Sequence, residues 1–116
     1  MPPRPFSARE RAAAEQADQQ RRQQVAAARA QLERCGDEIE ALTYAREAVT
    51  QRLLAPSTAD FPWANDEHVE VLACGRFRVR EYVDAQNGFG AMVRQQFAVT
   101  MRKGSDAWHA EDVSIW

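Results

Sequence analysis

Large apolar residues are unevenly placed along the chain. Alanine aside, five hydrophobic residues fall within 1–36 and 26 fall within 37–116. Residues 8–54 contain no proline and are rich in alanine, arginine, glutamine and glutamate, which favour helices. Ser7 and Glu10 are spaced as a capping box at the start of this segment. The sequence therefore predicts a long helix whose first part cannot form a core of its own.

Gly36 interrupts this helix, and two interpretations are open there. In one, Gly36 ends a first helix and Asp37, with Glu40, caps a second, giving a helical hairpin. In the other, a single helix continues at a cost of about 1 kcal/mol relative to alanine. Heptad spacing favours the continuous helix, because one stripe keeps its phase across Gly36. The stripe consists of Val25, Ala28, Leu32, Cys35, Ile39, Leu42, Arg46, Val49 and Leu53.

After Pro56, apolar and polar side chains alternate, as is typical of strands. Cys74-Gly75 predicts a tight turn, and Asp84–Gly90 predicts a loop with Phe89 as an aromatic anchor. Short turns between successive strands favour antiparallel neighbours. We therefore expect an α+β fold: a long N-terminal helix followed by a four-stranded antiparallel β-meander packed on the helix's C-terminal half.

The expected organisation has three parts: a disordered tail at 1–7, a projecting, coiled-coil-like helical arm at 8–39, and an α+β domain at 40–116. Because the stripe keeps its phase through the arm, the domain boundary is expected inside the helix, near residue 40.

Charge and cysteine content narrow the possible functions. Residues 1–36 have a net charge of +3 and residues 37–116 of −5, and neither value by itself implies a nucleic-acid or membrane partner. No apolar run approaches the roughly 18 residues of a membrane span. The N-terminus lacks the apolar region of a secretory signal, which predicts a cytoplasmic protein with Cys35 and Cys74 as free thiols.

Catalysis and metal binding find little support. Two cysteines with His68 and His109 have neither the number nor the spacing of a zinc site. Cys74 paired with either histidine is a conceivable nucleophile, but it falls in a tight turn without a nucleophile's usual surroundings. The sequence has no phosphate loop or dinucleotide fingerprint. We expect no enzyme activity, no catalytic residues, no metal and no cofactor.

An arginine stripe is the clearest candidate for a binding surface. Alternation along strands places five arginines on one polar sheet face: Arg76, Arg78, Arg80, Arg94 and Arg102. This face suits an acidic protein surface or a phosphate backbone. The interpretation we favour is cross-strand pairing on a solvated face, with Glu70, Glu81 and Glu111 as partners. Against RNA binding, Tyr82 is the sole aromatic candidate for stacking on this face.

Three separated motifs resemble a pattern found in small bacterial, prophage-encoded and lipoprotein-like chains. They are Leu54-Ala55-Pro56-Ser57-Thr58-Ala59-Asp60-Phe61-Pro62, then Tyr82-Val83-Asp84-Ala85-Gln86-Asn87-Gly88-Phe89-Gly90-Ala91, then Arg94 with Phe97. The resemblance covers roughly residues 45–102. It implies a portable domain at 40–116 and admits a phage origin, but it carries no catalytic residues.

The leading hypothesis is a non-enzymatic protein-interaction module that forms a homodimer through the helical arm. The expected dimer seam consists of Val25, Leu32, Cys35, Ile39 and Leu42. The alternative is that the stripe packs on the domain's own sheet, which we favour for residues 39–54 but not for residues 25–35, where a partner helix is the natural contact. The expected partner surface joins the five arginines to polar residues of the loop, Asp84, Gln86 and Asn87. Two other hypotheses are a phage-encoded, anti-CRISPR-like inhibitor of a host defence or nucleic-acid-processing complex, and direct nucleic-acid binding by the arginines.

Overall fold

The computed structural model describes residues 4–116 and consists of two helices followed by a sheet. Helix α1 spans Ala8–Cys35 and helix α2 spans Glu38–Thr50. The expected tail at 1–7 lies in part outside the described residues. Ser7 accepts a hydrogen bond on its Oγ from the Glu10 backbone N–H at 3.1 Å, as the capping box predicts.

The expected long helical segment is present over residues 8–50, but it is interrupted at Gly36 and Asp37, so the favoured uninterrupted helix is wrong at this point. Gly36 has φ +72°, a left-handed conformation that ends a helix. A Cβ at Gly36 would also lie 2.6 Å from a ring carbon of Trp108. Asp37 then caps α2 by accepting the Glu40 backbone N–H at 2.8 Å. Heptad spacing cannot reveal that the Trp108 ring lies this close to residue 36, and it is this ring that leaves no room for a side chain other than that of glycine.

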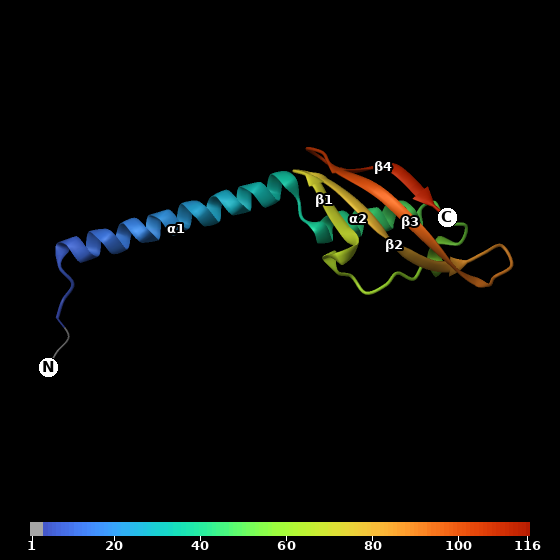
Figure 1. Cartoon of the computed structure of the whole chain (residues 1–116), viewed down its shortest axis with the longest axis horizontal. Coiled ribbons are helices and arrows are strands. Elements are labelled where there is room, and N and C mark those ends of the chain that lie inside the picture. Colours follow the sequence, from blue (N-terminus) through green and yellow to red (C-terminus); the bar gives the residue numbers. More distant parts are fainter. Residues whose placement is uncertain (1–3) are drawn as a thin grey trace. The chain divides into compact units, whose positions relative to one another are not determined.

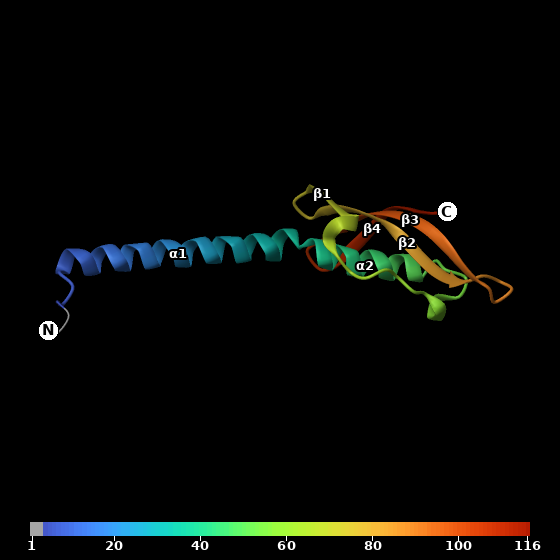
Figure 2. The ribbon, with the colours of Figure 1, turned by 60° about the horizontal axis from the view of Figure 1, so that its bottom comes forward.

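The sheet contains four antiparallel strands in the order β1-β2-β3-β4. The strands are β1 (Val69–Ala73), β2 (Arg76–Gln86), β3 (Met92–Lys103) and β4 (Trp108–Ile115). Two short 3-10 turns, η1 (Pro56–Thr58) and η2 (Asp66–His68), lie in the connection before β1. Helix α2 packs across one face of the sheet (Figure 1; Figure 2). The expected α+β fold with its antiparallel meander is therefore confirmed.

The core lies between α2 and the sheet. Helix α2 buries Ala41, Leu42, Ala45 and Val49 against inward-facing residues of β2 and β3. On β3 these are Phe97, Val99 and Met101, which the alternating pattern assigns to one face. Phe61, before β1, meets Phe97 edge to face with ring centroids 6.0 Å apart.

The central β2–β3 pair is regular, whereas both outer pairs are not. Residues from Arg76 to Gln86 pair without a break with residues from Arg102 to Met92. The β1–β2 register shifts between Val71 and Ala73, and the β3–β4 register shifts between Ala98 and Thr100. The second irregularity includes Asp112, whose φ is +51°. These irregularities have the character of β-bulges, which twist a sheet edge.

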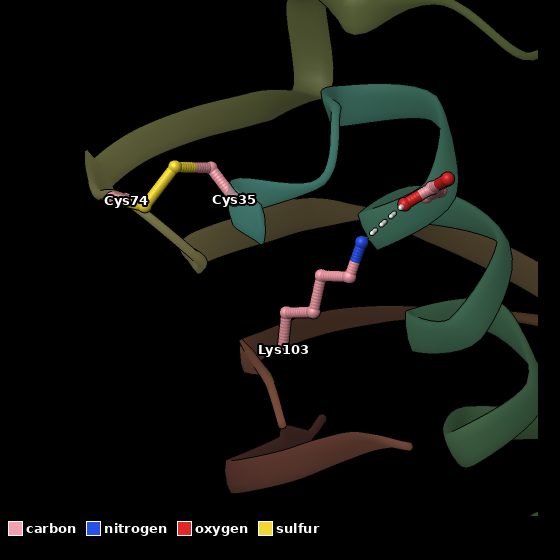
Figure 3. The surroundings of a disulfide bond; sticks show 4 residues. Cys35, Cys74 and Lys103 are labelled. Atoms are coloured by element: carbon pink, nitrogen blue, oxygen red, sulfur yellow. Dashed lines mark ion pairs between the residues drawn. A yellow bond between two sulfur atoms is a disulfide. The ribbon is translucent and has the colours of Figure 1, made fainter. Parts of the chain in front are cut away.

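A disulfide joins Cys35, the last residue of α1, to Cys74 in the β1–β2 turn (Figure 3). The expectation of two free thiols is therefore wrong. The two Cα atoms are 4.7 Å apart although 39 residues separate them in sequence. Nearby, Lys103 forms an ion pair with Glu40 at 3.8 Å. The bond ties the end of α1 to the sheet and lies within the compact unit Arg34–Trp116.

Candidate interaction surface

The five arginines occupy one face of the sheet, hereafter the arginine face. Strand pairing places Arg76 opposite Arg102, and Asp84 opposite Arg94. Arg78 and Arg80 alternate on β2 with the buried residues Phe77, Val79 and Glu81. The face therefore lies opposite the core, as the two-residue period of a strand predicts.

Arg94 is neutralised by Asp84. Its Nε donates to Oδ1 at 2.9 Å and its Nη2 donates to Oδ2 at 3.0 Å, a two-point geometry typical of strong guanidinium–carboxylate pairs. The guanidinium carbon also lies 3.8 Å from the centre of the Tyr82 ring. Hydrogen bonding from Arg94 holds the pKa of Asp84 below its ordinary value.

Glu111 of β4 pairs with two further arginines of the face. Arg102 Nε donates to one carboxylate oxygen at 2.8 Å, and Arg76 Nη2 donates to the other at 3.3 Å. The hydrogen bond from Arg102, with the nearby charge of Arg76, lowers the pKa of Glu111. Cross-strand pairing, the interpretation favoured from the sequence, accounts for Arg76, Arg94 and Arg102. Of the expected partners on this face, Glu111 takes part, whereas Arg94 pairs with Asp84 and Glu70 forms no ion pair within residues 4–116.

Arg78 and Arg80 differ from the other three. Within residues 4–116, neither forms an ion pair or a hydrogen bond through its guanidinium. The Nε of Arg78 is buried and has no hydrogen-bond partner in this described part of the chain. Both arginines line a hollow of about 330 Å³, with Glu67, His68, Val69 and Glu70.

Glu81 does not belong to the arginine face, so its expected role there is wrong. It points into the core, where its carboxylate accepts from Arg46 of α2 at 2.6 and 3.0 Å. Arg46 also donates to the Pro62 carbonyl at 2.9 Å and lies over the Phe61 ring. The sequence carried a signal for this pair. Glu81 is an even number of residues from Phe77 and Val79, which places it on the same inward face of the strand, and Arg46 stands in the apolar stripe of the helix.

The loop between β2 and β3 is shorter than expected, because Asp84, Ala85 and Gln86 belong to β2. Asn87 organises what remains: its side-chain Oδ1 accepts the backbone N–H groups of Phe89 at 2.9 Å and Ala91 at 3.1 Å. Phe89 is 97% exposed, so its expected role as an anchor is wrong. The loop is a hydrogen-bonded turn joining two long strands.

The three motifs of the resemblance meet in the structure. Asp60 of the first motif exchanges backbone hydrogen bonds with Asp84 of the second at 2.7 and 2.8 Å. Thr58 Oγ1 accepts the Gln86 backbone N–H at 2.9 Å. Arg94 of the third motif pairs with Asp84. Mutual support among these segments gives the motif residues a structural role.

The expected dimer seam is only partly exposed. Val25, Leu32 and Ile39 are 58%, 57% and 48% exposed, respectively. Leu42 is 1% exposed and belongs to the core, and Cys35 is bound to Cys74. These two residues therefore drop out of the seam, and Val25 and Leu32 are its remaining members in α1.

Two further kinds of site were sought among the described residues: a metal centre and a membrane span. No group of three or more histidine, cysteine, aspartate or glutamate side chains within residues 4–116 is arranged to hold a metal ion. No helix in that part of the chain is long and apolar enough to cross a membrane.

Comparisons with known proteins add no further guide: no family model, curated protein or solved structure matches the chain.

Proposed function

We propose that the protein is a non-enzymatic interaction module that self-associates through α1 and presents the arginine face to a protein partner. The observation that supports self-association is the exposure of α1. From Ala8 to Arg34 every side chain is exposed except that of Asp18, which is half-buried. Val25 and Leu32 stand seven residues apart on one side of the helix, with Ala28 between them, and no core formed by residues 4–116 covers them.

A second copy of α1 suits this stripe. Two parallel or antiparallel helices pack apolar residues at heptad positions into each other's grooves. The small side chain of Ala28 allows the two backbones to approach closely. The stripe is short, so the expected dimer is weak and depends on protein concentration.

Light scattering across micromolar concentrations tests self-association. The wild-type chain is expected to change from monomer to dimer as concentration rises, and Leu32→Asp is expected to stay monomeric. Ala30→Asp is the matched control, because it adds the same charge to the outer side of the same helical turn. A wild-type chain that is monomeric throughout would refute the dimer.

Ion pairs within the arginine face argue against nucleic-acid binding. Three of its five arginines are engaged by Asp84 and Glu111, which leaves little free positive charge for a phosphate backbone. We therefore favour a protein partner and expect no shift of single- or double-stranded DNA or RNA in a gel at low salt.

The phage-inhibitor hypothesis stays a prediction that depends on the resemblance, and a pull-down from host lysate tests it.

The disulfide is informative about the cellular compartment in which the protein resides. Disulfides persist in oxidising compartments and are rare where glutathione and thioredoxin keep thiols reduced. The Cys35–Cys74 bond therefore supports an oxidising compartment over the expected cytoplasm. Alkylation of cells before lysis, followed by non-reducing electrophoresis, would report whether the two thiols are oxidised in the host.

A further inference from the structure

Three arginines of the Arg34–Trp116 unit use their Nε atoms in the same way. Arg46, Arg94 and Arg102 each donate the Nε hydrogen to a carboxylate, at 2.6, 2.9 and 2.8 Å. Arg78 differs from these three, because its Nε is buried without an acceptor among the described residues. Buried donors in native proteins nearly always have a partner, which can be a water molecule or an ion as well as a protein group.

The space beside Arg78 is large enough for such a partner. The hollow of about 330 Å³ exceeds the roughly 30 Å³ that one water molecule occupies in the liquid, so it has room for a carboxylate side chain. It lies where η2 and β1 meet β2. Arg80, two residues along β2 on the same face, adds a second positive charge.

The chain's own carboxylates do not fill this role. Glu70 stands directly opposite Arg78 in the β1–β2 ladder, yet its side chain is exposed. The two form no ion pair in the described part of the chain, although Arg94 and Asp84, also directly opposite one another, do. Arg78 thus keeps a guanidinium that no carboxylate of the described residues engages.

We propose that this hollow binds a single carboxylate group, supplied by an aspartate or glutamate of a partner protein, with Arg78 as its principal donor and Arg80 as the second cation. The proposal deepens the proposed function by specifying what the arginine face recognises. The planar guanidinium fork matches a planar carboxylate at two points. Glu67 and Glu70 also line the hollow and repel a polyanion, so the site favours one negative charge over a phosphate chain.

Nuclear magnetic resonance of the arginine Nε–H groups tests the site in the full chain. The ¹⁵N-labelled protein is titrated with sodium acetate at mildly acidic pH, with sodium chloride added to keep ionic strength constant. The Arg78 signal, assigned by its loss in Arg78→Lys, is expected to shift saturably with acetate. The Arg94 signal, whose guanidinium is already paired, is expected to move much less.

Two variants separate external binding from internal pairing. Arg80→Lys keeps the Arg78 donor and is expected to retain the saturable shift. Glu70→Gln is expected to leave the signal of the acetate-free protein in place and to strengthen acetate binding by removing a repulsive charge. An Arg78 signal that ignores acetate but moves in Glu70→Gln would overturn the proposal, because Glu70 would then be the acceptor.

The choice of carboxylate has its own test. Titration with inorganic phosphate is expected to need a higher concentration than acetate for half of its effect. Half-saturation at a lower phosphate concentration would overturn the carboxylate assignment. Failure here is distinguishable from failure of the dimer, because acetate binding needs one copy of the chain and light scattering reports on α1 alone.

Discussion

Helices α1 and α2 come from one proline-free segment and share one unbroken heptad stripe, but their environments differ. Up to Arg34, α1 buries no side chain, whereas the shorter α2 buries four residues against the sheet. Helix α2 includes Leu42, Arg46 and Val49, which meet apolar residues or Glu81. The difference teaches that periodicity defines which side of a helix is apolar, while burial depends on what the rest of the chain places opposite.

The largest expected effect comes from the disulfide between the last residue of α1 and the β1–β2 turn. Removing the disulfide with Cys35→Ser and Cys74→Ser together frees a 39-residue loop in the unfolded chain. We expect the free energy of unfolding of the Arg34–Trp116 unit to fall by about 4 kcal/mol, measured by urea denaturation. Wild-type protein treated with reductant is the matched control and should lose a similar amount. Unchanged stability with reductant would show that the bond does not form in solution.

The second effect compares two leucines in the same stripe. Leu42→Ala is expected to lower the free energy of unfolding by about 3 kcal/mol, because it leaves a cavity between α2 and the sheet. Leu32→Ala, at a 57% exposed position, is expected to change it by less than about 0.5 kcal/mol in dilute solution. Urea denaturation followed by tryptophan fluorescence measures both, and equal losses would contradict the difference between the helices.

The third effect concerns how each helix begins. Asp37→Ala removes the acceptor for the Glu40 backbone N–H and is expected to destabilise the Arg34–Trp116 unit by about 1 kcal/mol. Asp37→Asn keeps an acceptor and should restore most of this loss. Ser7→Ala removes the corresponding cap of α1. We expect it to lower helix content slightly by circular dichroism without moving the unfolding midpoint, and a moved midpoint would contradict this.

The smallest expected effect is a loss of folding stability at low pH that arises from two ion pairs of the sheet. The pKa values of Asp84 and Glu111 are lowered in the folded state by Arg94 and Arg102. Their contribution to stability is therefore complete above the ordinary pKa values of 3.8 and 4.5, and it is lost as pH falls through the lower folded-state values. Denaturation as a function of pH should show a shallower acid loss in Asp84→Asn with Glu111→Gln. An unchanged slope would mean that the two ion pairs do not couple to folding.

The sheet could be predicted from the sequence because its signals are local. Alternation assigned Phe97, Val99 and Met101 to the core and placed the arginines on the opposite face. The turn at Cys74-Gly75 was also predicted correctly, since β1 ends at Ala73 and β2 begins at Arg76. These features depend on neighbours within a few residues.

The remaining features depend on contacts between distant parts of the chain. The disulfide needs the end of α1 to meet a turn 39 residues away, and Gly36 needs Trp108 beside it. That the Nε of Arg78 has no partner among the described residues becomes evident only once every neighbouring carboxylate has a position. No periodicity encodes such contacts, so the candidate site was only partly predictable: its arginines were identified, but their pairing was not.

The irregular registers at Val71/Ala73 and Ala98/Thr100 have a consequence for assembly. A straight outer strand offers a row of free backbone groups on which another strand can add, and bulged outer strands offer a poor template for such growth. In this sheet both outer pairs are bulged while the inner pair is regular. Lateral strand addition, a common route to fibres, is therefore discouraged at both edges. A partner of this sheet, if the proposed function holds, would therefore have to contact its side chains and not its backbone edges.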